Sequence, residues 1–268
     1  ILSAILPRCH DTSSFVRASS LKALSKLSSR SCVPVDAFPV VAGAVVDRLA
    51  DKTVMVRRNA MATLKSLLEN NPYGANLDPE GYQKKAKELE DWLERTEKES
   101  DKLAKRAAAL QQDIERRDEA GDIVADEERS QLDALVEAVA SAEQREQAEP
   151  EDSRAAAERA GKSKALAFAS AAAAFVALLE SANESLAAML LSKSASDVNE
   201  ALRFYVKARH FRLPCAVSGM RRALSLMFSD EKTVRAEVLK TFMDVFVNAP
   251  AAEGDKAQLL DPKQISHN

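Results

Sequence analysis

The sequence predicts an all-α solenoid, because one pattern of apolar side chains returns at a fixed distance along the chain. In the segment 51–68 four side chains are spaced by four, four and three residues, which places them on one stripe of a helix. They are Val56, Ala60, Leu64 and Leu67, and forty residues earlier the same stripe is Val16, Ser20, Leu24 and Leu27. A repeat near forty residues that holds two amphipathic helices is typical of a HEAT-type α-solenoid.

Charged residues repeat in the same register. Asp51 corresponds to Asp11, and Arg57 corresponds to Arg17. Each aspartate precedes a predicted helix, where its carboxylate can bind free backbone N–H groups. We expect the aspartates and arginines to pack and to form a ladder of hydrogen bonds between repeats, with no catalytic role.

A third copy of the stripe lies near the end of the chain. It comprises Val234, Val238, Phe242 and Val245, behind Asp230 and Arg235. The composition agrees with helix throughout, since hydrophobic residues make up 46% and aromatic residues 5%, with only 7 glycines. An ordinary helical bundle is the alternative to the solenoid.

The chain divides into four predicted segments. Helix pairs at 1–29 and 33–71 make a first HEAT-type domain (1–72), and an acidic insertion follows (73–163). HEAT-type helices continue over 164–250, and a polar tail follows (251–268). In the third segment, we expect Lys164–Leu191 to dock on the solenoid. Ser196 or Asp197 is expected to cap the helix that ends at His210. Residues 214–247 are expected to form the last helix pair.

The insertion is acidic whereas the rest of the chain is basic. Residues 80–160 contain 24 acids and 14 bases, against 17 acids and 24 bases elsewhere. From Tyr82 to Ile114 steps of four and three give a heptad seam, and a weaker seam returns at Leu132, Leu135, Val136 and Val139. The chain therefore predicts a HEAT-repeat solenoid interrupted by a charged helical hairpin that reverses near 120–122, although a single solvated helix is also compatible. Residues 143–163 have almost no large apolar side chain and are expected to be disordered.

Several classes of function have no support in the sequence. No nucleophile elbow, phosphate-binding glycine loop, zinc motif or paired-cysteine motif occurs, so we expect no enzyme, cofactor, metal or small-molecule substrate. Cys9, Cys32 and Cys215 are scattered, which favours a reducing compartment. The apolar stretch 165–179 is short and alanine-rich, so we expect no membrane span. The chain begins at Ile1 inside a predicted helix, and we expect it to be part of a longer protein.

One basic stretch, in contrast, has a composition that points to a binding function. The segment 201–222 contains six bases and no acid, namely Arg203, Lys207, Arg209, Arg212, Arg221 and Arg222, with Phe204, Tyr205 and Phe211 among them. Such a cluster can bind phosphates of DNA or meet an acidic protein surface. It can equally be a solvated face whose aromatic side chains turn into the core.

Two runs of sequence resemble the HEAT-repeat regulatory subunits of condensin. One is SKSASDVNEALRFYVKARHFRLPCAVSGMRRALSLMFSDEKTVRAEVLKTFMDVF, and the other is RLADKTVMVRRNAMATLKSLLENNPYG before a long charged insertion. The insertion itself has no motif of the family. The related subunit of condensin II is the family member most easily confused with this one.

The resemblance implies a non-enzymatic subunit of a chromosome-organising complex in the nucleus and on chromosomes during mitosis. Such a subunit is held by the kleisin chain, touches the SMC ATPase heads and helps clamp DNA. The alternatives are a nuclear transport receptor and a phosphatase scaffold, both HEAT solenoids. A transport receptor usually has an acidic concave face, and a phosphatase scaffold keeps its repeats regular throughout.

Overall fold

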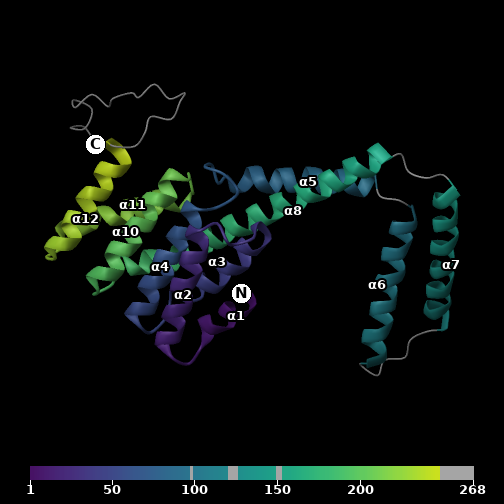
Figure 1. Cartoon of the computed structure of the whole chain (residues 1–268), viewed down its shortest axis with the longest axis horizontal. Coiled ribbons are helices and arrows are strands. Elements are labelled where there is room, and N and C mark those ends of the chain that lie inside the picture. The colour runs from purple at the N-terminus through teal and green to yellow at the C-terminus, as the bar shows by residue number, and fades with distance from the viewer. Residues whose placement is uncertain (97–98, 120–125, 149–152, 248–268) are drawn as a thin grey trace. The chain divides into compact units, whose positions relative to one another are not determined.

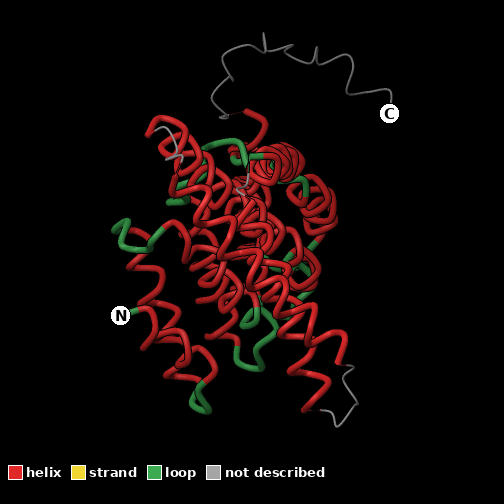
Figure 2. The backbone as a smooth tube through the Cα atoms, turned by 90° about the vertical axis from the view of Figure 1, so that its right-hand side faces the viewer, coloured by secondary structure: helices red, strands yellow, loops and turns green. Residues whose placement is uncertain are grey.

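The structure, a computed structural model, describes residues 1–96, 99–119, 126–148 and 153–247. Within these ranges every regular element is a helix and no strand occurs (Figure 2). The chain forms two compact units, one of residues 1–82 and 170–268 and the other of residues 83–169. These divisions follow Tyr82 and Ala169, whereas the sequence placed its boundaries at 72/73 and 163/164, which stay predictions.

The first unit begins with two helix pairs. The first pair is α1 (Leu2–Ile5), which continues into the 3₁₀ helix η1 (Leu6–His10), and α2 (Ser14–Ser29). The second pair is η2 (Val35–Ala37) with α3 (Phe38–Val46), followed by α4 (Val54–Glu69). Helix α4 begins and ends forty residues after α2, which confirms the predicted repeat.

Two further pairs follow the insertion. They are α9 (Asn183–Met189) with α10 (Ala195–His210), and α11 (Cys215–Ala223) with α12 (Lys232–Phe242). The 3₁₀ helix η3 (Leu224–Phe228) extends α11, and the π-helical turn η4 (Met243–Val247) extends α12. Helix α4 packs on both α2 and α10, and α10 packs on α12 (Figure 1). Helices separated by the whole insertion are therefore neighbours in one stack, and the prediction of an all-α solenoid is confirmed.

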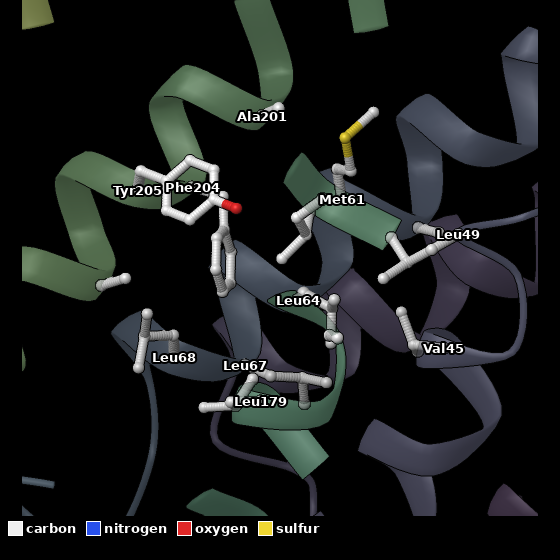
Figure 3. Packing of buried hydrophobic residues seen from close by; sticks show 14 of the residues in the cluster. Val45, Leu49, Met61, Leu64, Leu67, Leu68, Leu179, Ala201, Phe204 and Tyr205 are labelled. Atoms are coloured by element: carbon white, nitrogen blue, oxygen red, sulfur yellow. The ribbon is translucent and has the colours of Figure 1, made fainter. Parts of the chain in front are cut away.

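The predicted stripes face the core of this unit. Val56, Ala60, Leu64 and Leu67 are all completely buried, and Val234, Val238 and Val245 are buried at the C-terminal end. Figure 3 shows Leu64 and Leu67 in one cluster with Leu179, Phe204 and Tyr205. Because each stripe is covered by the neighbouring pair, the hydrophobic gain arises between repeats.

The alanine-rich region after the insertion docks on the first unit, as expected for part of 164–191. It forms α8 (Ser153–Ser181), which ends before α9 instead of continuing to Leu191. Phe175 is fully buried, with its ring centroid 5.8 Å from that of Phe38 and 5.5 Å from that of Tyr73. Aromatic contacts of this kind anchor the end of α8 beside α3.

The second unit contains α6 (Glu99–Glu119) and α7 (Asp126–Ala148), with parts of α5 (Pro79–Arg95) and α8. Helices α6 and α7 lie side by side (Figure 1), and Arg117 Nη1 of α6 donates to Glu128 Oε1 of α7 at 2.9 Å. Ala107 and Ile114 of the predicted seam are buried, but Val136 of the returning seam is 56% exposed. The reversal predicted at 120–122 lies outside the described residues.

Two local predictions in this unit differ from the structure. A seam from Tyr82 to Ile114 requires one continuous helix, but α5 ends at Arg95. There Thr96 Oγ1 donates to the carbonyl oxygen of Trp92 (2.9 Å) and competes with continued helix. Residues 143–148 and 153–163, expected to be disordered, are helical. Alanine favours helix strongly, and Lys162 Nζ lies 5.2 Å from the centre of the Trp92 ring. Residues 149–152 and the tail 251–268 lie outside the described residues.

Candidate nucleic-acid interface

Turns of one geometry precede α2 and α4. The Oδ1 atoms of Asp11 and Asp51 each accept a hydrogen bond from the backbone N–H two residues later, at 2.9 and 3.0 Å. Six residues after each aspartate, Nη1 of Arg17 or Arg57 donates to that aspartate's carbonyl oxygen, at 2.9 and 2.8 Å. Each turn is therefore closed by its own aspartate and arginine, as the sequence predicted for the aspartates.

The arginine of the first repeat also binds the aspartate of the second. Arg17 Nε lies 2.7 Å from Asp51 Oδ2, and its Nη2 lies 2.9 Å from Oδ1. Burial by itself would raise the pKa of Asp51, but hydrogen bonds from Arg17 and from the Thr53 N–H hold that pKa below its usual value. This bidentate pair is the first step of the predicted ladder between repeats.

The second ion pair of the ladder joins a residue before the insertion to a residue after it in the sequence. Arg57 Nη2 and Nε donate to Asp197 Oδ2 at 2.6 and 3.2 Å, although the two residues are 140 positions apart. The Asp197 side chain is fully buried and also accepts from Ser192 Oγ at 3.1 Å. A buried carboxylate needs such a partner, so the pair fixes α10 beside α4.

Serine replaces aspartate in the turns of the last two repeats, which corrects two predictions. Ser192 and Ser229 precede α10 and α12 by three residues, as Asp11 and Asp51 precede α2 and α4, and their hydroxyls accept the N–H two residues later. Asp230 is therefore not the turn residue of the third copy. Neither Ser196 nor Asp197 caps α10: Ser194 is at its N-cap, and the Asp197 carboxylate is used by Arg57 instead. A serine hydroxyl can accept the hydrogen bond from the backbone N–H, but it has no charge with which to form an ion pair with an arginine.

The first two bases of the basic stretch are tied into ion pairs between helices. Arg203 Nε lies 2.8 Å from Glu237 Oε1 of α12, and its Nη1 lies 3.0 Å from Glu200 Oε1. Lys207 Nζ lies 2.9 Å from Glu69 Oε1 at the end of α4. Hydrogen bonding to Glu237 is the main cause that raises the pKa of Arg203. These two candidates thus stabilise the stack. Glu200 lies three residues before Arg203, but the sequence did not indicate the other two partners, because Glu69 and Glu237 lie in other repeats.

The other four bases form a different surface. Arg209, Arg212, Arg221 and Arg222 are exposed, and none has an ion pair within the described part of the chain. Arg209 is in the last turn of α10, and Arg221 and Arg222 are in the last turn of α11, where cations suit the helix dipole. Arg209 and Arg221 line one groove, so the structure brings these two together. We call the four residues the arginine surface.

Arg212 has an uncommon backbone conformation. Its φ is 59°, in the left-handed region, where it ends α10. The N–H of Leu213 reaches the carbonyl oxygen of Ala208 at 2.9 Å, and the N–H of Arg212 reaches that of Arg209 at 3.1 Å. This helix ending usually uses glycine, which has no Cβ to strain.

The aromatic residues of the basic stretch point into the core. Phe204 and Tyr205 are completely buried, and Tyr205 Oη donates to Asn183 Oδ1 at 2.9 Å. Burial raises the pKa of Tyr205. A Cβ on Gly219 of α11 would overlap the Tyr205 ring, so α11 approaches α10 closely. These aromatic side chains therefore offer no stacking platform for bases.

Within the described residues the structure offers no set of side chains for a metal site. Across the described ranges no three His, Cys, Asp or Glu side chains gather as metal ligands would. Cys9 and Cys215 are buried free thiols, and burial raises the pKa of both. His10 and His210 are exposed at separate sites, and His267 lies outside the described residues.

One stretch has the length and composition of a membrane-spanning helix. It is Ala156–Met189, with a mean hydropathy of 1.8 in its most apolar window. A buried core helix of a soluble protein passes the same test; here 33% of that window is buried, and Ala172, Phe175, Val176 and Leu179 belong to the hydrophobic cluster.

Comparisons with known proteins give relatives of one kind. No family model matches the chain. The chain is 26% identical to the condensin-1 complex subunit CAP-D2 of Arabidopsis thaliana, in an alignment that covers 97% of this chain and 18% of that protein. It is 40% identical over 68 residues to condensin complex subunit 1 of both Mus musculus and Homo sapiens, which covers 25% of this chain and 5% of each relative. The chain thus spans a minor part of the relatives that it matches.

Solved structures with loosely similar architecture include engineered repeat proteins. A designed armadillo repeat protein is 15% identical, covering 91% of this chain and 100% of its own, with a TM-score of 0.24. A superposition this loose has no bearing on the fold, which rests on the helix stacking described above. The sequence relatives confirm the resemblance predicted from the two quoted runs, and the chain is a relative of condensin complex subunit 1.

Proposed function

We propose that this chain is part of a non-enzymatic HEAT-repeat scaffold subunit of condensin. In this role it binds kleisin, SMC ATPase heads and DNA during mitotic chromosome condensation, in the nucleus and on chromosomes. The similarity to the condensin-1 complex subunit CAP-D2 of Arabidopsis thaliana over nearly the whole chain supports membership of the complex. Stacked helix pairs without a metal-ligand cluster in the described ranges suit a binding scaffold.

The observation that carries the DNA-binding part is the arginine surface. Its four guanidinium groups are exposed at the ends of α10 and α11, and no carboxylate pairs with them within the described residues. Guanidinium groups match phosphate oxygens in geometry and remain charged at any physiological pH. Phosphate contacts without aromatic stacking are independent of base sequence, as a chromosome scaffold requires.

A charge reversal tests this proposal. Arg209, Arg212, Arg221 and Arg222 are all changed to Glu, and the affinity of the assembled complex for duplexes of unrelated sequence is measured by fluorescence anisotropy. We expect a loss on the order of tenfold or more for every duplex, because four phosphate contacts become repulsive. The matched control changes four exposed bases elsewhere to Glu, namely Lys22, Lys26, Arg30 and Arg58.

The outcomes separate DNA from a protein partner. Equal DNA affinity in the arginine-surface variant and the control variant would contradict the proposal. If the arginine-surface variant keeps its DNA affinity but loses kleisin or an SMC head from the complex, the arginines contact an acidic protein patch. Urea unfolding of both variants checks that the repeats stay folded.

A further inference from the structure

A groove lies between α11 and α12 at the last helix pair. Five apolar residues line it together with the exposed residues Arg209 and Arg221, which we call its rim. The apolar residues are Val217, Met220, Leu224, Phe242 and Val245, and the groove holds about 200 Å³. That volume accommodates one or two aliphatic side chains.

The walls of this groove are incompletely covered. Val217 is 45% exposed and Leu224 is 50% exposed, whereas the inner residues of the same helices, Ala216 and Ala223, are completely buried. Covering apolar surface releases roughly 25 cal/mol for each Å² removed from water. An occupant with large aliphatic side chains would therefore gain free energy here.

The rim adds a charge requirement. Neither Arg209 nor Arg221 has an ion pair within the described ranges, and both line the same groove. An occupant that places a carboxylate beside its aliphatic side chains would satisfy the apolar walls and the cationic rim together. The occupant is thus expected to combine leucine-like and acidic residues.

The chain itself provides such a segment a short distance beyond the groove. Residues 255–261 read DKAQLLD, in which Leu259 and Leu260 adjoin Asp261. Val245 forms part of the groove wall, and the intervening backbone can extend roughly 3.3 Å per residue, enough to return to the groove. We propose that the groove is the docking site for Leu259, Leu260 and Asp261 of this chain, which lie outside the described residues.

Docking of this segment and phosphate binding would use the same two arginines, Arg209 and Arg221, so the inference is tested without DNA. Amide hydrogen exchange is followed by mass spectrometry in the full chain and in the double variant Leu259→Asp/Leu260→Asp. Docking predicts that amides of residues 215–224 exchange several-fold faster in the variant, because the segment no longer covers α11. Amides of α2 should exchange equally in both proteins.

A matched control carries the same charge change in the same segment. It is Gln264→Asp/Ser266→Asp, which should leave exchange in α11 unchanged. Asp261→Arg and Arg221→Asp should each speed exchange, and combining them should restore slow exchange through the swapped ion pair.

Two results would overturn the inference. Unchanged exchange of residues 215–224 in Leu259→Asp/Leu260→Asp would show that Leu259 and Leu260 do not cover the groove. Protection that rises with protein concentration would assign the occupant to a second copy of the chain.

Discussion

The two halves of the basic stretch 201–222 differ in how their charges are used. Arg203 and Lys207, at helical spacing on α10, are held by Glu237 and Glu69 of neighbouring helices. The arginine surface, at the ends of α10 and α11, is exposed and has no ion pair within the described residues. Charge in a sequence is therefore not the same as charge that a partner can reach.

The difference follows from the face of α10 on which each base lies. Arg203 and Lys207 are four residues apart and share one face, where they meet acids of α12 and α4, because α10 packs on both helices. Lys207 and Arg209 are both in the last turn of α10, yet only Lys207 has an ion pair within the described residues. In a solenoid, bases that do not face the acids of a neighbouring repeat are thus the better candidates for binding an anionic partner.

The largest expected loss of stability comes from removing the ion pair that holds α10 beside α4. Asp197→Ala should lower the free energy of unfolding by about 3 kcal/mol, since it leaves Arg57 without its carboxylate. The control Asp230→Ala removes an exposed carboxylate that has no described ion pair, and it should cost little. Equal urea midpoints for the two variants would refute the structural role of Asp197.

A smaller loss of stability is expected from a substitution that disturbs the packing of α11 on α10, the two helices near the arginine surface. Gly219→Ala should cost roughly 1–3 kcal/mol, because the added methyl overlaps the buried Tyr205 ring. Gly161→Ala has open space around the new Cβ and should be neutral or stabilising by up to about 1 kcal/mol. Thermal unfolding compares the two variants, and a stable Gly219→Ala protein would contradict the close approach.

Neutralising one base from each half sharpens the comparison. Arg203→Gln should cost roughly 0.2–1 kcal/mol, since the Arg203 side chain is 45% exposed and its ion pairs are partly screened. Arg209→Gln should change stability less. A double-mutant cycle of Arg203 with Glu237 should give a favourable coupling energy, and zero coupling would mean that the pair contributes nothing in solution.

The smallest effect on stability belongs to Arg212. Arg212→Gly relieves the strain of the left-handed backbone conformation in the folded state, but it also raises the conformational entropy of the unfolded chain. Because the two effects oppose each other, the free energy of unfolding should change by less than about 1 kcal/mol. Its DNA affinity should nevertheless fall, because one phosphate contact is lost. Unchanged DNA affinity would remove Arg212 from the arginine surface.

The repeats could be predicted from the sequence because their pattern is local. The spacing of Val56, Ala60 and Leu64 returns at forty residues, and the helices containing it have matching bounds. The aspartates of the turns could also be predicted, since Asp11 and Asp51 bind backbone two residues away. Such interactions depend on residues that the sequence places together.

Pairings across the stack could not be predicted. Nothing in the sequence distinguishes Asp197, which binds Arg57, from a helix cap, or indicates that Glu237 is a partner of Arg203. These pairings depend on which helices become neighbours after the insertion. Likewise, helix at 153–163 was missed because the scarcity of large apolar residues suggested disorder, whereas alanine content and the contact of Lys162 with Trp92 favour helix.

The central claim is that the arginine surface, and not the paired bases, contacts DNA phosphates. The most direct test measures the slope of log affinity against log salt concentration for the full chain and for single Gln variants at each of the six bases. We predict that Arg209→Gln, Arg212→Gln, Arg221→Gln and Arg222→Gln each flatten the slope by roughly one unit, while Arg203→Gln and Lys207→Gln leave it unchanged. A slope that responds equally to all six substitutions, or to none of them, would contradict the account.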